Sequence, residues 1–274
     1  MAGRGGCHGE VCLQRDAGGD ATLSNEAARH LQSVLRVRPG DCVEAFDGQG
    51  RTRAMAVAET GKRSLRLVAS GDPVTHEPPS PRVTLFAAPC KSNRMDWLVE
   101  KAVELGAWQI TAVATERCVV KHVEKREPER WRRIAREALR QCGGAWEPEI
   151  RCVDFKAFCG EAAAMAQRGG AVWFGDLQSG TGWKPILPVF EYAWCVGPEG
   201  DFTEAETAAM REAGALGVSL GPRVLRSETA GVFGLCVISA LSACRPDDLS
   251  KNITDRPSGC QADTSIPTTE ASHA

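Results

Sequence analysis

The sequence lacks the features that mark membrane, secreted or metal-binding proteins. No apolar run approaches the roughly 20 residues that a membrane-spanning helix needs. Residues 1–16 mix acids with bases and contain no apolar stretch, so we expect no signal peptide. The 12 cysteines include no C-x-x-C pair, and the spacing of Cys7, His8 and Cys12 matches no structural zinc site. We therefore expect a cytoplasmic protein with reduced cysteines and no metal.

The chain also lacks an excess of positive charge. Its 274 residues carry 33 Lys and Arg against 35 Asp and Glu, a net charge of −2. Binding of nucleic acid would therefore depend on local basic patches, such as the arginine-rich segment 130–140, which could equally be a solvated helix face. With 43% hydrophobic and 25% charged residues, the composition is that of a globular protein of one or two domains.

The first 75 residues have the pattern of a small β-rich module. We expect a helix over 26–35, capped by Ser24 or Asn25, and strands over 42–46, 53–58 and 64–69, separated by turn residues. Residues 71–81 contain four prolines and are typical of a linker.

From residue 83 the pattern changes to alternating strands and helices. Strands are expected at 83–88, 110–114, 172–174, 193–196 and 218–220. Helices are expected from Asn93 to Gly106, from Pro128 to Cys142, at 156–167 and 203–213, and from Thr229 to about Ala243. This alternation predicts a mostly parallel α/β sheet. The last of these helices is apolar nearly all round and should be buried on every side, in the core or against a partner. The polar segment from Arg245 onward is expected to be disordered.

Two glycine–proline loops follow neighbouring strands. Gly197-Pro198-Glu199-Gly200 precedes a helix that opens with a capping box, Thr203 and Glu206. Glycines let the backbone approach a ligand closely, and ligands of open α/β sheets bind at the carboxyl ends of strands. A plain turn between strand and helix is the alternative.

The second loop starts at Gly221-Pro222 and ends in a polar set at the start of the long helix. Its members are Arg223, Arg226, Ser227, Glu228 and Thr229. Ser227 or Thr229 could be merely a helix cap, with the arginines solvated. The two loops together favour a ligand site. No G-x-G-x-x-G opens a βαβ unit, which argues against a Rossmann-type nucleotide enzyme.

These motifs resemble those of a known family. GPEG at 197–200 followed by FTE at 202–204, and LGPRVLRSETA at 220–230, are similar to the two C-terminal motifs of the RsmE-type ribosomal RNA methyltransferases of the SPOUT class. Residues 91–106, 115–118 and 130–150 resemble the middle of that family, and residues 30–48 resemble its N-terminal RNA-binding module. The resemblance covers about residues 21–243.

The resemblance implies an architecture and a reaction. It implies a PUA-like β-barrel domain over 1–75 and an α/β SPOUT domain with a C-terminal deep trefoil knot over 76–246. The polar composition of 247–274 leaves these residues as a disordered tail. It implies a homodimer that uses S-adenosyl-L-methionine to methylate N3 of a uridine in small-subunit (16S) ribosomal RNA. No membrane association is expected.

The resemblance also assigns roles to residues of the two loops and of the basic segment. The implied cofactor-binding residues are Gly197, Glu199, Gly200, Leu220, Gly221, Leu225, Arg226 and Thr229. The implied catalytic residues are Arg226, which could stabilise charge on a uracil oxygen, and Glu228 or Glu199, which could take the N3 proton. The implied RNA contacts are Arg36, Lys91, Arg94 and Arg117.

Two positions depart from the family pattern. Asp201 stands where the family usually has Gly, and Gly144 stands where it often has Arg. If position 201 needs a positive φ, Asp is among the better-tolerated residues. These departures leave open a catalytically weakened RNA-binding protein with the same fold. A SPOUT methyltransferase acting on another RNA is a further alternative, against which the match over 91–118 argues.

Overall fold

The structure is a computed structural model that describes residues 10–12, 19–33, 35–118, 127–179, 182–183 and 189–243. The predicted tail from Arg245, and most of the first 20 residues, lie outside the described residues. Within the described part, no helix is long and apolar enough to cross a membrane.

The N-terminal part is a six-stranded sheet with one helix. Its elements are β1 (Glu10–Cys12), β2 (Ala21–Ser24), α1 (Asn25–Ser33), β3 (Cys42–Phe46), β4 (Arg51–Thr60), β5 (Ser64–Ala69) and β6 (Val74–Thr75). The strand order is β1-β3-β4-β5-β2. β6, which lies in the segment expected to be a linker, pairs with β4. Leu31, Met55 and Leu67 pack in its core. The β-rich module is confirmed, although the pattern did not predict β1, β2 and β6.

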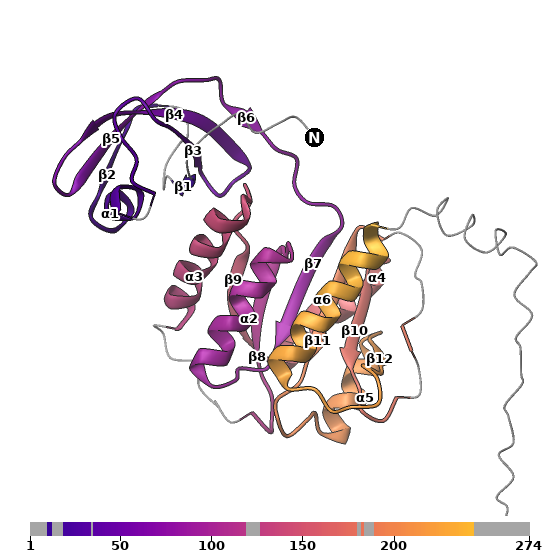
Figure 1. Cartoon of the computed structure of the whole chain (residues 1–274). Coiled ribbons are helices and arrows are strands. Elements are labelled where there is room, and N and C mark those ends of the chain that lie inside the picture. Colours follow the sequence, from indigo (N-terminus) through magenta and orange to yellow (C-terminus); the bar gives the residue numbers. More distant parts are fainter. Residues whose placement is uncertain are drawn as a thin grey trace, which may run out of the picture.

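The second part is a six-stranded, entirely parallel sheet with helices on both faces (Figure 1). Its elements are β7 (Arg82–Ala87), α2 (Ser92–Glu104), β8 (Gln109–Ala114), α3 (Glu127–Cys142), β9 (Glu149–Asp154), α4 (Phe155–Gln167), β10 (Ala171–Gly175), β11 (Glu191–Val196), α5 (Glu204–Glu212), β12 (Leu216–Val218) and α6 (Ser227–Ala243). The strand order is β12-β10-β11-β7-β8-β9. The parallel α/β prediction is confirmed.

Three details differ from the sequence expectation. β9 was not predicted. The last strand ends at Val218 rather than residue 220, because the chain then turns away at Gly221, whose φ is +108°. Lys91, not Asn93, is the N-cap of α2, since its carbonyl already accepts from the amides of Arg94 and Met95.

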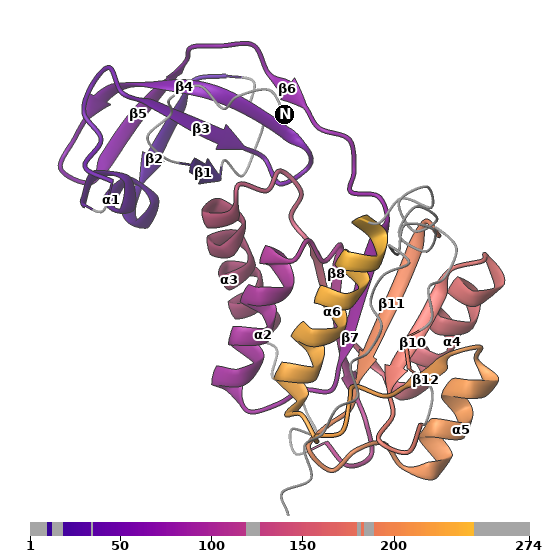
Figure 2. The ribbon, with the colours of Figure 1, turned by 45° about the vertical axis from the view of Figure 1, so that its right-hand side comes forward.

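Helices α2, α3 and α6 cover one face of this sheet, and α4 and α5 cover the other, as the turned view makes clear (Figure 2). The larger core lies between the sheet and helices α2, α3 and α6, and it contains Met95, Trp131 and Ile238. The smaller core, on the opposite face, contains Phe158 of α4 and Met210 of α5.

Two glycines let α6 lie close to its neighbours. A Cβ at Gly231 would be 2.7 Å from Leu98 of α2, and one at Gly234 would be 2.2 Å from the indole of Trp194 in β11. The Trp194 indole is fully buried and its Nε1 donates to the carbonyl of Ala230 at 3.1 Å. The expectation that α6 is buried on every side does not hold within the single chain, because Phe233 is 39% exposed.

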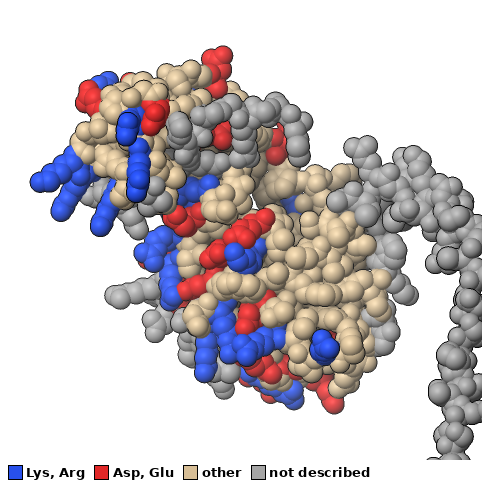
Figure 3. All heavy atoms as spheres, viewed as in Figure 1, with Lys and Arg blue, Asp and Glu red and all other residues tan. Residues whose placement is uncertain are grey.

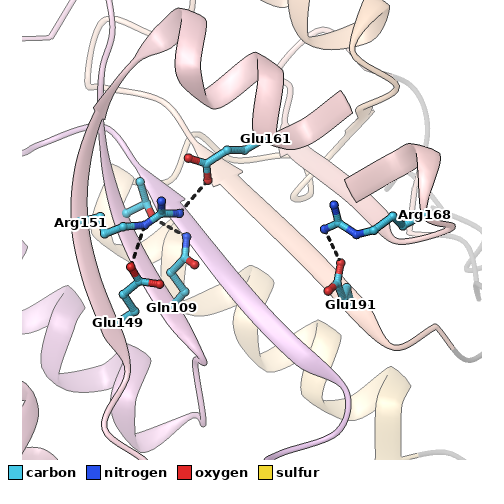
Figure 4. A network of polar contacts seen from close by, with 7 residues as sticks. Gln109, Glu149, Arg151, Glu161, Arg168 and Glu191 are labelled. Atoms are coloured by element: carbon cyan, nitrogen blue, oxygen red, sulfur yellow. Dashed lines mark hydrogen bonds and ion pairs between the residues drawn. The ribbon is translucent and has the colours of Figure 1, made fainter. Parts of the chain in front are cut away.

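Paired charges occupy the edge where β8, β9 and β11 begin (Figure 4). Arg151 lies 3.3 Å from Glu149 and 2.8 Å from Glu161, and Arg168 lies 2.9 Å from Glu191. Such partly exposed ion pairs add little stability. Because each of these arginines faces a carboxylate, this edge is a weak candidate for anion binding.

Most of the described cysteines are free thiols. The free thiols are Cys90, Cys118, Cys142, Cys152, Cys159, Cys195 and Cys236. Cys42 is disulfide-bonded, so the expectation of reduced cysteines throughout is wrong at that position. A disulfide depends on two sulfurs meeting in the fold, which spacing along the sequence does not reveal.

Candidate cofactor and catalytic site

A cavity of about 250 Å³ lies at the edge where the parallel strands end. Its walls are the segments that follow β10, β11 and β12, together with the start of α6. Both glycine–proline loops line this one cavity, as expected. The expectation that their strands are neighbours is wrong, because β10 lies between β11 and β12 in the sheet. The predicted residues that line it are Gly197, Glu199, Leu220, Gly221, Leu225 and Arg226.

Two glycines of the cavity wall have different surroundings. Gly221 has a φ of +108°, which L side chains rarely adopt, and a Cβ there would meet no atom within 4 Å. A larger residue at Gly221 would therefore strain the backbone, and its side chain would enter open space at a position that lines the cavity. Gly197 lies against the ring of Phe202, which a Cβ would approach to 3.1 Å.

The walls combine apolar and acidic groups. Val196, Leu220, Leu225 and Ala230 supply an apolar surface that suits a flat aromatic base. Asp176, Glu199 and Asp201 also line the cavity, together with two arginines, Arg223 and Arg226. This set suits a ligand that combines an aromatic base with positive charge.

Asp176 is a site residue that sequence reasoning missed. It follows β10 directly and is only 9% exposed. One carboxylate oxygen accepts from the amide of Gln178 at 2.9 Å, and the other lies 2.6 Å from the guanidinium of Arg211. Its position directly after a buried strand was the available signal, since that strand ends at the same edge as the two predicted loops.

A charge cluster joins three elements beside the cavity. Nη1 of Arg94, on α2, lies 3.3 Å from Oε1 of Glu199, and its Nε lies 3.7 Å from Oε1 of Glu228. Arg94 thus connects the two predicted catalytic carboxylates. Glu228 is 8% exposed, and its Oε2 has no hydrogen-bond donor in the described part of the chain. A buried acceptor without a donor is costly unless a ligand supplies one.

Cys90, in the segment after β7, lies close to this cluster. Burial raises the pKa of its thiol to about 12, and the negative charges of Glu228 and Glu199 add to the shift. Cys90 is therefore a neutral thiol near pH 7.

Three of the predicted cofactor-binding and catalytic residues, Gly200, Glu228 and Thr229, lie outside the cavity wall, as do the four predicted RNA contacts. Gly200 packs against Arg117, whose Nη1 donates to the Gly200 carbonyl at 3.0 Å and to that of Phe202 at 3.5 Å. Arg117, which was predicted only as an RNA contact, therefore also holds this loop in place. Thr229 is exposed on α6.

Glu206 also holds the loop after β11 in place. It completes the predicted capping box with Thr203 at the start of α5, and its other carboxylate oxygen accepts from the amide of Glu116 at 2.8 Å. The residues after β8 are thus tied to those after β11.

The other two predicted RNA contacts are both exposed. Lys91 stands at the N-cap of α2, beside the charge cluster. Arg36 lies in the N-terminal part and has a φ of 54°.

The two departures from the family pattern have different settings. Asp201 has a φ of 60°, and its Oδ1 accepts from the amide of Phe202 at 2.8 Å. The position does have a positive φ, as its usual glycine suggested. Gly144 lies elsewhere, on a cavity between the N-terminal part and the parallel sheet.

Comparison with known proteins agrees with this arrangement. Residues 76–239 match the model of the RNA methyltransferase domain, and residues 23–70 match that of the RNA methyltransferase PUA domain. The chain belongs to the RNA methyltransferase family. Its N-terminal part is therefore a PUA-like domain, and the parallel sheet carrying the cavity is the methyltransferase domain.

Relatives of this RNA methyltransferase include proteins named ribosomal RNA small subunit methyltransferase E. That of Mycobacterium tuberculosis is 30% identical over 83% of this chain and 89% of its own. That of Bacillus subtilis is 27% identical over 80% of this chain and 89% of its own. The solved structure of the Neisseria gonorrhoeae protein of that name, bound to S-adenosyl methionine, is 28% identical, with a TM-score of 0.75 over 85% of this chain and 97% of that one.

Proposed function

We propose that this RNA methyltransferase uses S-adenosyl-L-methionine to methylate N3 of a uridine in small-subunit (16S) ribosomal RNA. The observation that carries the proposal is the cavity between the strand-end loops. Relatives of this chain are named ribosomal RNA small subunit methyltransferase E, which supports the proposed substrate. The PUA-like domain supports an RNA substrate. A ribosomal substrate places the activity in the cytoplasm.

The residues around the cavity suit this cofactor. Leu220 and Leu225 offer an apolar slot for the adenine, and Gly221, where a Cβ would meet no atom within 4 Å, leaves room for it. Gly197 lets the ring of Phe202 pack closely behind this wall. Carboxylates at Asp176 and Glu199 complement its positive charge. When bound, S-adenosylmethionine supplies an electrophilic methyl group. Of the other predicted cofactor residues, Arg226 lines the cavity, whereas Gly200 and Thr229 would act from outside its wall.

The chain's own contribution is to prepare the uracil as a nucleophile. N3 of uridine carries a proton near neutral pH, so the site must accept that proton and stabilise the charge that develops on the ring. We assign proton acceptance to Glu228, because its buried Oε2 lacks a donor. Arg226, on the cavity wall, stabilises the negative charge on a uracil oxygen. Glu199 is the competing acceptor, and Arg94 holds both carboxylates in place.

Exposed cations near the site support the RNA-binding role. Lys91 and Arg117 flank the strand-end loops, and Arg36 extends the contact to the PUA-like domain. Such residues position the phosphate backbone without reading sequence. Arg94 stays a predicted RNA contact, although its guanidinium faces two carboxylates.

We also propose a homodimer formed through α6. The side chain of Phe233 is 39% exposed on this helix and that of Trp97 is 42% exposed on the adjacent α2. The surface over α6 is largely free of charge in the view of Figure 3. Exposed apolar surface of this kind favours association with a second copy.

The family resemblance further implies a trefoil knot and the division into 1–75, 76–246 and a tail over 247–274. The path of the chain supports the knot: after β12 at the sheet edge it returns as α6, which packs across β11 and β7. The matched ranges 23–70 and 76–239 support the two-domain division.

Calorimetric titration with S-adenosylmethionine tests the cofactor site. We expect saturable binding that is lost in Gly221→Leu. Gly40→Leu is the matched control, because Gly40 also has a positive φ, +93°, and no atom within 4 Å of a Cβ, but lies in the PUA-like domain. Equal loss of binding in both variants would show that backbone strain, not the cavity, is responsible. No binding by the folded wild type would contradict the proposal.

The catalytic assignments are tested by separating kcat from cofactor affinity. Glu228→Gln and Arg226→Ala should each lower kcat by about 100-fold, an ordinary contribution for acid–base or charge-stabilising groups, with little change in cofactor affinity. If Glu199→Gln lowers kcat instead and Glu228→Gln does not, Glu199 is the acceptor. Arg223→Ala, an arginine of the same cavity wall, is the control for Arg226→Ala.

A further inference from the structure

The two domains meet through a short backbone ladder, which we call the seam. It joins the turn 47–50, between β3 and β4, to residues 145–147, just before β9. The amide of Gly50 donates to the carbonyl of Ala145 at 3.0 Å, and the amide of Glu147 donates to the carbonyl of Gly48 at 2.8 Å. Gln49 and Trp146 face each other in an antiparallel bridge. Residues 47–50 are therefore a docking element as well as a turn.

The indole of Trp146 packs directly on Gly50 at the seam. A Cβ at Gly50 would be 2.3 Å from Cζ2 of this ring, and Gly50 has a φ of +91°. The Trp146 Nε1 donates to the carbonyl of Glu77 at 3.1 Å, and the adjacent His76 amide donates to the carbonyl of Gly50 at 2.7 Å. The ring thus packs on Gly50 and on the segment that leads to β7, so that only a residue without a side chain fits at position 50.

Part of the boundary between the domains is loosely filled. A cavity of about 690 Å³ opens beside the seam, with Arg53 and His76 on one side and Trp108 and Gly144 on the other. Other contacts also cross this boundary: Phe46 of β3 is fully buried in the core beneath α2 and α3, and β1 contacts α3. The seam and Trp146 add the hydrogen bonds described above. The orientation of the PUA-like domain therefore depends on the seam together with the buried Phe46.

The seam is remote from the cofactor cavity. It lies at the edge where β7 and β9 begin, whereas the cavity lies where β10, β11 and β12 end (Figures 1 and 2). Strands of six residues separate the two edges by about 20 Å. At that distance a small rotation of the PUA-like domain displaces any RNA held on it by several ångströms relative to the cavity.

We propose that Gly50 and Trp146 are a pair of positioning residues that lock the PUA-like domain and thereby set which part of a bound RNA reaches the cofactor cavity. The inference rests on the proposed function, since it assumes that the PUA-like domain holds the RNA. Neither residue touches the cofactor cavity.

The test combines kinetics with hydrogen exchange on the full chain. Gly50→Ala should raise KM for small-subunit ribosomal RNA at least tenfold, leave kcat within threefold, and leave the affinity for S-adenosylmethionine unchanged. Gly40→Ala is the control for positive-φ strain, because nothing lies within 4 Å of a Cβ there. Trp146→Ala should also raise KM. In that background the additional effect of Gly50→Ala should fall below threefold, because the ring that it meets is gone.

Hydrogen exchange keeps the test independent of activity. In Gly50→Ala, peptides containing the amides of residues 50 and 147 should exchange at least tenfold faster, while peptides of β4 stay protected, which shows that the seam opens without unfolding of the domain. Unchanged KM with faster exchange would refute the positioning role. Unchanged exchange of the amides of residues 50 and 147 in Gly50→Ala would refute the claim that Gly50 and Trp146 hold the seam closed. Failure of the wild type to bind S-adenosylmethionine or methylate RNA would overturn the proposed function, while the exchange result would still decide whether the lock exists.

Discussion

Two glycine-to-alanine substitutions in helices should change stability in opposite directions. Gly160 lies on the exposed side of α4, and a Cβ there would meet nothing within 4 Å. Gly234 lies in α6, where a Cβ would be 2.2 Å from Cε2 of Trp194, a fully buried side chain. Alanine is favoured over glycine inside a helix by up to about 1 kcal/mol, and both variants receive this contribution. Only Gly234→Ala also suffers overpacking.

Overpacking of a dense core costs about 1–3 kcal/mol. The rigid indole of Trp194 cannot yield as a flexible side chain would, so we place the cost at the upper end. The free energy of unfolding should therefore fall by about 2 kcal/mol in Gly234→Ala and rise by up to about 1 kcal/mol in Gly160→Ala.

Urea unfolding of the two variants and the wild type measures both changes as shifts in the midpoint at constant m. If Gly234→Ala is as stable as Gly160→Ala, α6 does not pack on Trp194 as described. That result would also remove the support that this contact gives to Ala230 in the cofactor cavity wall.

Three further predictions concern residues around the same site. Cys90, whose pKa is raised to about 12, should resist alkylation at pH 8 while the exposed Cys142 reacts. The alkylation rate of Cys90 should still be rising at pH 11, and mass spectrometry of the modified peptides measures both rates. Asp201→Gly should change the free energy of unfolding by less than about 1 kcal/mol, because relief of the positive φ offsets the lost hydrogen bond from the Phe202 amide. Asp201→Val should be clearly destabilising in the same urea experiment, because a β-branched side chain does not tolerate that φ. Glu206→Gln should cost about 1–3 kcal/mol, since both carboxylate oxygens accept from backbone amides and an amide side chain leaves one of them unpaired; a thermal melt with no downward shift would contradict this.

Periodic and local signals predicted much of the fold. The strand over 64–69 has the expected bounds, and the parallel sheet followed from the alternation of strands and helices. Elements without a strong local signal were missed. β9 has a single buried residue, Ile150, among its six, and the two-residue strand β6 exists only because it pairs with β4.

The candidate site divides in the same way. Glycines and a capping box marked both loops, because their conformations are encoded locally. The contacts of Arg94 with Glu199 and Glu228 depend on how α2 packs beside α6, which no local pattern encodes. The same holds for Asp176, whose role depends on where β10 lies in the sheet, and for Gly50, whose partner Trp146 is distant in sequence.

The most direct test of the central claim is methyl transfer itself. Purified protein is incubated with methyl-labelled S-adenosylmethionine and small-subunit ribosomal RNA, and the RNA is digested to nucleosides for mass spectrometry. The account predicts label in 3-methyluridine, in wild type and in Gly40→Leu, and none above background in Gly221→Leu. Label in a ribose or in another base would contradict the proposed reaction, and a folded protein that binds RNA but transfers no methyl group would contradict catalysis altogether.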